Sequence, residues 1–271
     1  MNNKIIAEFI SPFTGLPTHQ VASISKDGKE YTIRQDSDGN AFVSPLPSEK
    51  ELLAFYNKPY FSDQGSQERS NNQLTTILKS KHFIPEGKAL DIGCGNGYLL
   101  HVLKQAGLTV LGIDFSKAAI ESARNSGLST NEVLLGGIES LPNHSKFDYI
   151  MLMDVLEHVR EPKKIITDIA SIMSSHTTLF IKTMFHDDWY GQSIGSDKYW
   201  QDHSWEHIYV PSIKGLAFLM LKNGLELLEV FRQEKSGPIL SARKINGSEL
   251  NLAETRVQKI VMDIYSQIER Q

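Results

Sequence analysis

The chain has 271 residues, of which 40% are hydrophobic and 22% are charged, a composition typical of a folded globular protein. The formal net charge is −4 and lysine and arginine form no run, so the sequence gives no basic surface for nucleic acid or an anionic membrane. Its apolar runs are far shorter than the roughly 20 residues of a membrane span. The single cysteine, Cys94, excludes an internal disulfide and a cysteine-only zinc site. We therefore expect a cytoplasmic protein without a secretory signal, a membrane span or a nucleic-acid partner.

The first region, residues 1–47, is polar and rich in turns. Short alternating stretches are separated by Asp27-Gly28 and Asp38-Gly39, dipeptides that favour tight turns between antiparallel strands. This pattern predicts a small β-hairpin appendage.

Helical patterns flank the central part of the chain. Ser48 and Glu51 form a capping-box pattern, which predicts a helical cap over residues 48–85 with a second helix over Gln67–Phe83. Residues 246–271 predict one amphipathic helix. Its apolar side carries Leu250, Val257, Ile260, Val261, Ile264 and Ile268. We expect that side to pack on the chain's own body, with dimerisation as the alternative.

Between these flanks, residues 86–245 alternate between short apolar strands and helical stretches. The predicted strands are Lys88–Ile92, Leu108–Ile113, Glu132–Leu135, Tyr149–Met153, Leu179–Thr183, Leu225–Arg232 and Pro238–Arg243. The predicted helices are Gly97–Ala106, Lys117–Ser126, Pro162–Ser174 and Pro211–Asn223. This alternation predicts an α/β fold with a doubly wound, Rossmann-like, mostly parallel seven-stranded sheet whose ligand site lies beyond the carboxyl ends of the strands.

A glycine-rich loop follows the first of these strands. The strand ends at Asp91, and Gly93, Gly95 and Gly97 then lead into a helix. Glycines let backbone N–H groups approach a ligand closely, and the helix start adds a positive dipole end. Asp114 ends the second strand, where a carboxylate can accept hydrogen bonds from both hydroxyls of a ribose. The pattern indicates a nucleoside-binding site.

The spacing of the loop disfavours a dinucleotide. The glycines are spaced G-x-G-x-G, and Tyr98 stands where the third glycine of the G-x-G-x-x-G fingerprint would fall. No tyrosine has a lysine four residues later, as a short-chain dehydrogenase would need, and no G-x-x-x-x-G-K-[ST] phosphate loop is present. An NAD-dependent oxidoreductase therefore stays a less favoured alternative.

The loop and Asp114 together resemble the cofactor half of class I S-adenosylmethionine-dependent methyltransferases. The similarity continues through Gly136–Pro142, Phe147–Ile150 and Asp154–Val159. Within Trp200–Gly224, Glu206-His207 and the segment from Lys222 resemble the small-molecule branch of that family, and the whole similarity covers roughly residues 30–245. It implies S-adenosylmethionine (SAM) as cofactor and S-adenosylhomocysteine (SAH) as product. The residues that it implies at the cofactor are Asp91, Gly93, Cys94, Gly95, Gly97, Tyr98, Asp114, Phe115, Ser116, Ile138, Glu139, Met153, Asp154 and Val155.

One position departs from that family. Relatives usually carry an acidic residue at position 137 to meet the adenine amino group, and this chain has Gly137. Glu139 is the expected substitute.

The N-terminal region resembles the zinc-ribbon start of some sugar and natural-product methyltransferases. Its four ligand positions would be Ser11, Thr14, Gln35 and Asp38. Zinc is held by thiolates or imidazoles, so one carboxylate among neutral oxygens predicts a metal-free remnant. We expect this region to position substrate through Tyr56, Tyr60 and Phe61.

Aromatic residues are concentrated between Phe185 and Tyr209, a stretch that follows a predicted strand on the ligand side of the sheet. Two interpretations stay open, a substrate lid that excludes water and a small aromatic core under a long loop. The substrate residues expected under the first are His186, Trp189, Trp200, His203 and Trp205, in addition to Tyr60 of the N-terminal part.

Histidines are the candidates for a general base, because imidazole titrates near neutrality. His158 and His207 are the leading candidates, with His186 behind them. His158 is four residues past Asp154, which predicts that both project from one helix face. A Glu157-His158 pair binding a divalent ion is a minority alternative, and no metal is predicted.

These patterns favour methyl transfer to a small-molecule acceptor, such as a sugar, a lipid precursor or another metabolite. The chain has no Pro-Pro, which the amino-methylating DNA and RNA enzymes of this fold carry in their catalytic loop. Cytosine C5 methylation requires a nucleophilic cysteine, and Cys94 is committed to the glycine loop. Both observations disfavour nucleic-acid acceptors. An inactive SAM-binding protein is the alternative. We expect a monomer or a homodimer.

Overall fold

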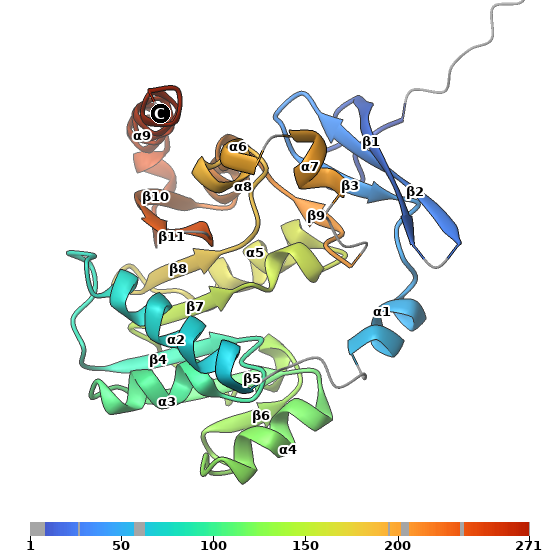
Figure 1. Ribbon diagram of the computed structural model, residues 1–271. Helices are drawn as coiled ribbons and strands as arrows, with labels where there is room; N and C mark the ends of the chain where they lie inside the picture. The colour runs from blue at the N-terminus through green and yellow to red at the C-terminus, as the bar shows by residue number, and fades with distance from the viewer. Residues whose placement is uncertain are drawn as a thin grey trace, which may run out of the picture.

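Two β-sheets organise the part of the chain that the structure describes (Figure 1). The computed structural model describes residues 9–26, 28–56, 63–194, 196–201, 206–233 and 236–270. Its strands are β1 (Thr18–Lys26), β2 (Lys29–Asp36), β3 (Ala41–Ser44), β4 (Lys88–Ile92), β5 (Thr109–Asp114), β6 (Val133–Leu135), β7 (Tyr149–Met153), β8 (Thr178–Lys182), β9 (Tyr209–Val210), β10 (Leu225–Gln233) and β11 (Ser236–Lys244). Its helices are α1 (Glu49–Tyr56), α2 (Asp63–Ile77), α3 (Tyr98–Gln105), α4 (Lys117–Asn125), α5 (Pro162–Ile172), α6 (Trp189–Ile194), α7 (Ser196–Gln201), α8 (Ile213–Lys222) and α9 (Leu250–Ile268), with short 3₁₀ turns η1 (Ile138–Ser140), η2 (Leu156–His158) and η3 (Gly247–Glu249).

The larger sheet has seven strands in the order β10-β11-β8-β7-β4-β5-β6. The five strands from β8 to β6 run parallel, and β11 and β10 add an antiparallel edge. The chain winds from β4 outward to β6 and then returns to β7 on the other side of β4. Ligands of such sheets bind where the winding reverses, at the carboxyl ends of the strands. The predicted doubly wound, seven-stranded α/β fold is confirmed.

Alternating side chains divide the core between the two faces of this sheet. In β7, Ile150 and Leu152 belong to one apolar cluster, whereas Tyr149, Met151 and Met153 belong to the other. The first cluster includes residues of α5, α8 and α9, and the second includes residues of α3 and α4. Successive side chains of a strand point to opposite faces, so the two clusters lie on opposite sides of the sheet and helices cover both, as the alternation of strands and helices predicted.

The N-terminal region is larger than the predicted hairpin. β1, β2 and β3 form an antiparallel meander, and β9 pairs with β3 as a fourth strand through Ala41↔Val210 and Phe42↔Tyr209. β9 comes from a part of the chain more than 150 residues away, which local sequence patterns do not link to this region. Tyr209 and Val210 are buried there, so the second sheet and the main body share one interior.

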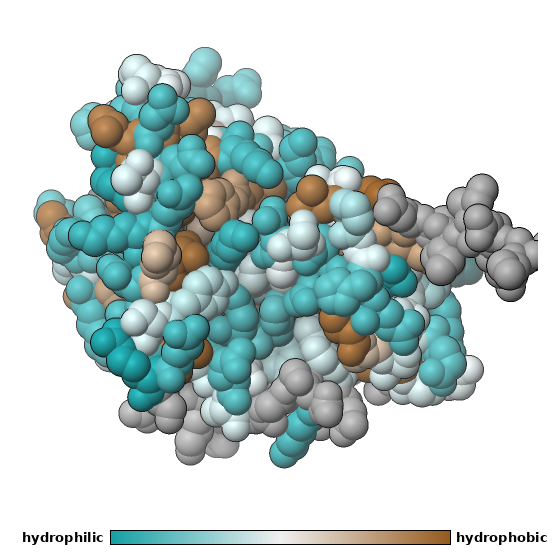
Figure 2. Space-filling view, turned by 90° about the horizontal axis from the view of Figure 1, so that it is seen from above, coloured by the Kyte–Doolittle hydropathy of each residue, from teal (hydrophilic) through white to brown (hydrophobic). Residues whose placement is uncertain are grey.

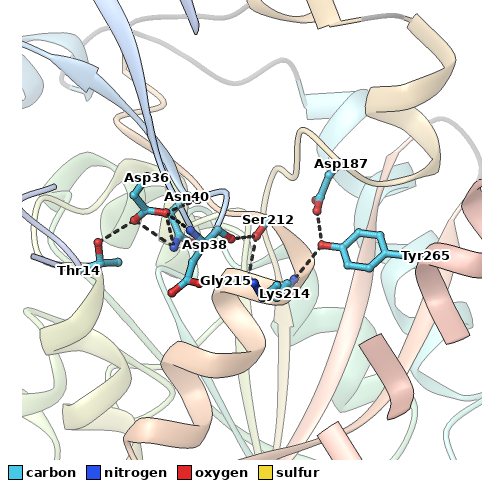
Figure 3. Close-up of polar contacts among 9 residues, drawn as sticks. All are labelled: Thr14, Asp36, Asp38, Asn40, Asp187, Ser212, Lys214, Gly215 and Tyr265. Atoms are coloured by element: carbon cyan, nitrogen blue, oxygen red, sulfur yellow. Dashed lines mark hydrogen bonds and ion pairs between the residues drawn. The ribbon is translucent and has the colours of Figure 1, made fainter. Parts of the chain in front are cut away.

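Polar side chains fasten this second sheet to α8 (Figure 3). Asp36, at the end of β2, accepts hydrogen bonds from the backbone N–H and the side-chain amide of Asn40, at 2.9 Å and 3.3 Å. Asn40 in turn accepts one from the buried hydroxyl of Tyr209 at 3.0 Å. A Cβ at Gly215 would lie 2.1 Å from Asn40 Oδ1, so Asn40 occupies the space that a side chain at this position of α8 would need.

The start of α8 and the helix α9 extend this network (Figure 3). Ser212 donates its hydroxyl to the backbone carbonyl of Asp38 at 2.7 Å. Lys214 pairs with the Asp38 carboxylate at 3.5 Å, and its backbone N–H donates to the hydroxyl of Tyr265 in α9 at 3.3 Å. Tyr265 donates to Asp187 at 2.5 Å. Four segments that lie far apart in the sequence are thus joined around the first turn of α8.

Hydrogen bonds also organise the positions at which a zinc ribbon would carry its ligands. Ser11 Oγ accepts the N–H of Thr14 at 3.2 Å, and the Thr14 hydroxyl donates to Asp36 at 2.7 Å. Asp38 forms the ion pair with α8, and the Gln35 amide donates to the backbone of the turn after β2. Each of these four side chains takes part in a hydrogen bond or an ion pair.

The C-terminal helix α9 packs its apolar side on the main body. Val257, Val261 and Ile264 are buried in the larger core cluster, and Ile260 and Ile268 pack against it. Leu250 stays exposed. Among the described residues, no helix combines the length and the apolar character that crossing a membrane requires. On the face seen in Figure 2, hydrophobic residues gather in small separate groups within a mainly hydrophilic surface.

Candidate functional site

The glycine loop between β4 and α3 takes a backbone conformation that few side chains tolerate. Gly93, Gly95 and Gly97 have φ angles of 74°, 54° and 81°. A Cβ at Gly93 would lie 2.5 Å from Val155, and one at Gly97 would lie 2.4 Å from Leu128. A Cβ at Gly95 would meet no atom within 4 Å. Two of the glycines therefore allow close packing within the protein, and Gly95 faces open space.

Hydrogen bonds join this loop to the end of β5, where the N–H groups of Gly93 and Cys94 donate to the Ile113 carbonyl at 2.8 Å and 3.1 Å. The backbone N–H of Gly95 donates to Asp114 Oδ2 at 2.9 Å, and the N–H of Ser116 donates to Asp114 Oδ1 at 2.7 Å. Ser116 also caps α4, because its hydroxyl oxygen accepts the N–H of Ala119 at 3.2 Å. The two elements singled out in the sequence lie side by side at the carboxyl edge of the sheet.

Burial perturbs the acidic groups beneath the loop. Asp91 is only 3% exposed, and burial together with the charge of Asp114 raises the pKa of Asp91 to about 8. Burial raises the pKa of Asp114 also, although its two backbone hydrogen bonds favour the charged form. Cys94 turns inward, since a Cβ at Gly112 would lie 2.7 Å from its sulfur, and burial raises the pKa of the thiol. Cys94 can thus serve a ligand through its backbone only.

The exposed ring of Phe115, which follows β5, and the carboxylate of Glu139, which follows β6, both lie beside Gly137. Phe115 is 75% exposed although it is large and apolar. Glu139 accepts the N–H of Gly137 at 2.8 Å, and a Cβ at Gly137 would lie 2.6 Å from Glu139 and 2.7 Å from the Phe115 ring. Any larger residue at position 137 would displace one of these side chains. Ile138 lies beside them, partly buried against the larger core cluster.

The segment after β7 differs from its predicted form. We expected Asp154 and His158 on one helix face, and this is wrong. Asp154 precedes the 3₁₀ turn η2 and has a left-handed φ of 57°, so no helix joins the two residues. Its carboxylate pairs with Lys182 at the end of β8 and accepts the amide of Gln73 from α2 at 3.1 Å. Val155 packs against Gly93 of the glycine loop.

His158 and His207, the two leading candidates for a base, lie together. Their ring centroids are 4.9 Å apart, and His158 Nδ1 is 3.3 Å from the backbone carbonyl of Glu206. Next to His158, Glu157 is buried and accepts the hydroxyl of Thr183 at 2.7 Å. Burial raises the pKa of Glu157, and the charge of His158 opposes that shift. The two histidines come from chain segments almost 50 residues apart.

The predicted substrate residues fall into two groups. His186 lies against the second sheet, with Nε2 2.6 Å from the carbonyl of Gly39 and its ring 5.7 Å from that of Trp200. Trp189 and Trp200 are buried within α6 and α7, in two different apolar clusters. These positions match the core interpretation of the aromatic stretch more closely than an open lid. Tyr60, His203 and Trp205, together with Phe61, lie outside the described residues, and the side chain of Tyr56 is not described.

The remaining predicted cofactor residues lie at the ends of their elements. Met153 is the last residue of β7 and is buried, and Tyr98 is the first residue of α3. Sequence reasoning missed Lys182 and Gln73. A lysine that ends an otherwise apolar strand is a usable signal for Lys182. The polar sequence of α2 gives no such signal for Gln73.

Comparison with known proteins agrees with this geometry. The model of the methyltransferase domain family matches residues 67–230. The ubiquinone biosynthesis O-methyltransferase of Vibrio parahaemolyticus is 31% identical over 117 residues, which are 41% of this chain and 50% of that protein. The chain thus spans about half the length of the curated relatives it matches.

Solved structures share the fold at low sequence identity. The PH0226 protein from Pyrococcus horikoshii OT3 superposes with a TM-score of 0.56 at 18% identity, covering 71% of this chain and 98% of that one. Magnesium protoporphyrin IX methyltransferase from Synechocystis PCC 6803 with bound SAH gives a TM-score of 0.51 at 18% identity, covering 71% and 92%. The family match spans more than half of the 271 residues. The chain therefore belongs to the methyltransferase domain family and has the fold of class I, S-adenosylmethionine-dependent methyltransferases.

Proposed function

We propose that the chain transfers a methyl group from SAM to a small-molecule acceptor. The observation that carries this proposal is the hydrogen bond of 2.9 Å between the Gly95 N–H and Asp114. It joins the glycine loop to the carboxylate at the carboxyl edge of the sheet, where this class of fold binds ligands. The curated relatives are O-methyltransferases, which favours a hydroxyl acceptor.

The residues at this edge fit an adenosine that carries a methionine tail. Each Asp114 oxygen accepts one backbone N–H and keeps a lone pair for a ribose hydroxyl. The exposed ring of Phe115 offers a stacking surface for adenine, with Glu139 beside it. Gly95 leaves open space where the methionine part would lie. Tyr98 at the head of α3 leaves no glycine for the close passage of a pyrophosphate.

The chain's own groups would assist the transfer by position and by proton removal. Bound SAM supplies an electrophilic methyl group on a sulfonium. His158 is the proposed general base, because its ring lies at the end of η2 on the carboxyl edge and packs against His207. The carbonyl of Glu206 beside Nδ1 favours the tautomer with its proton on that nitrogen, and Nε2, which is unprotonated in that tautomer, is the proposed basic atom. Such a base contributes a factor of roughly 10²–10⁴.

Calorimetric titration of SAH tests the cofactor assignment. Asp114→Ala removes the carboxylate that would hold the ribose, so we expect binding to weaken by about 1.5–3 kcal/mol, the range for hydrogen bonds to a charged group. Asp148→Ala is the matched control, because that aspartate lies near the opposite end of the sheet, where it accepts the N–H of Lys88 at the start of β4. An unchanged dissociation constant for Asp114→Ala would refute the assignment.

Transfer of labelled methyl groups tests the reaction. We expect incorporation into one member of a panel of phenols, sugars, lipid precursors and other small metabolites. SAH binding without incorporation into any acceptor of the panel would instead favour a SAM-binding protein that has lost catalysis.

A further inference from the structure

A partly buried ion pair lies at the carboxyl edge of the sheet beside the proposed cofactor site. Lys182 ends β8, and its ammonium pairs with Asp154, which follows β7. The Lys182 side chain is 8% exposed and that of Asp154 is 21% exposed. The backbone repeats the contact, because the Asp154 N–H donates to the Lys182 carbonyl at 2.9 Å. The pair therefore has a fixed place next to the glycine loop, because Val155, which follows Asp154, packs against Gly93 of that loop.

The second oxygen of Asp154 is also engaged. Gln73 of α2 donates its side-chain amide to Asp154 Oδ2 at 3.1 Å, and Gln73 is itself buried. A lysine and an amide thus hold one carboxylate from two sides. Burying a lysine is costly unless an opposite charge compensates it. Lys182 therefore neutralises Asp154, and Asp154 neutralises Lys182.

This neutralisation matters because the cofactor and its product differ in charge. SAM carries a positive sulfonium, whereas the sulfur of SAH is neutral, and their other ionised groups are the same. A carboxylate without its lysine would attract the sulfonium, and a lysine without its carboxylate would repel it. When the charges of Asp154 and Lys182 cancel, the site has little electrostatic preference for SAM or for SAH.

We propose that Lys182 determines the preference of the site between SAM and SAH by neutralising Asp154. The proposal rests on the proposed function, which places the methionine part of the ligand at Gly95; Val155, the neighbour of Asp154, packs against Gly93 of the same loop. Lys182 acts through Asp154 and through its own charge, so it is a positioning and specificity-determining residue.

The ratio of the dissociation constants of SAH and SAM, measured by calorimetry, tests this proposal. Lys182→Met leaves Asp154 unneutralised and should raise the ratio in favour of SAM. Asp154→Asn leaves Lys182 uncompensated and should lower it, and asparagine tolerates the left-handed backbone at this position. For unit charges about 10 Å apart at an effective dielectric constant of about 20, each change is on the order of tenfold.

The double variant K182M/D154N removes both charges, and its ratio should return close to that of the unmodified chain. Lys182→Arg keeps the charge and should keep the ratio. Thr76→Val is the control for loosening of α2, because Thr76 accepts the amide of Gln233 in β10 at 3.2 Å without touching Asp154. It should leave the ratio unchanged.

Equal losses of both ligands in Lys182→Met and Asp154→Asn would overturn the proposal and assign the pair a structural role. If Lys182→Met fails to fold, an unchanged ratio in Asp154→Asn overturns it alone. Failure of the proposed function is a separate result, because the unmodified chain would then bind neither SAM nor SAH.

Discussion

Two glycines of one loop provide a matched test of how the loop is built. Gly93 and Gly95 both have left-handed backbones, with φ angles of 74° and 54°. An alanine at either position pays about 1–2 kcal/mol for that conformation. The new methyl group at Gly93 would also lie 2.5 Å from Val155, whereas the methyl group at Gly95 would meet nothing within 4 Å. The same substitution should therefore have two different effects.

The overlap sets the magnitude at Gly93. Val155 is β-branched and packs against the core, so relieving a contact of 2.5 Å should cost about a further 1–3 kcal/mol, the usual range for overpacking. We expect Gly93→Ala to lower the free energy of unfolding by about 2–5 kcal/mol. Gly95→Ala should lower it by about 1–2 kcal/mol and weaken SAH binding, because its methyl group enters the space left for the ligand.

Urea unfolding of the ligand-free chain, followed by circular dichroism, measures the first effect, and calorimetry with SAH measures the second. A double variant, G93A/V155A, removes the overlapping methyl groups and should recover about 1–2 kcal/mol relative to the sum of the single changes. Equal unfolding losses at Gly93 and Gly95, or no coupling between Gly93 and Val155, would refute this account of the loop.

Four further substitutions address the site and the second sheet. Asp91→Asn should flatten the pH dependence of the free energy of unfolding. The pKa of Asp91 rises from 3.8 to about 8 on folding. The contribution of Asp91 to stability is therefore full below pH 3.8 and is lost as the pH rises toward 8. Parallel pH profiles of the two proteins between pH 5 and 9 would contradict this. His158→Ala should lower methyl transfer by a factor of roughly 10²–10⁴ while leaving the SAH dissociation constant unchanged, and His207→Ala should lower it less, because His207 packs against the proposed base; full turnover in His158→Ala removes the general base. Gly215→Ala places a methyl group 2.1 Å from Asn40, so limited proteolysis should release the N-terminal sheet faster, and an unchanged cleavage rate would count against that docking.

Local patterns were sufficient for the main sheet. Each apolar strand and the loop of Gly93, Gly95 and Gly97 is a continuous stretch of sequence, and Asp114 directly ends one of the strands. Parallel neighbouring strands then bring their carboxyl ends to the same edge of the sheet. The proximity of the loop to Asp114 followed from topology alone. The division into four regions and the roles of the site residues stay predictions.

Long-range pairings were not readable from the chain. β9 joins the N-terminal sheet because Tyr209 and Val210 find buried places against β3, and nothing near them in sequence indicates that partner. The Asp154–Lys182 pair depends on a left-handed residue that replaced the expected helix. Trp200 is buried against the second sheet, one of the two places that the aromatic composition of its stretch left open.

The central claim is that the loop and Asp114 hold a single adenosine with a methionine tail rather than a dinucleotide. Parallel calorimetric titrations of the unmodified chain with SAH and with NADH test it most directly. The account predicts one SAH bound per chain and no heat of binding from NADH. Tight binding of NADH without binding of SAH would contradict it.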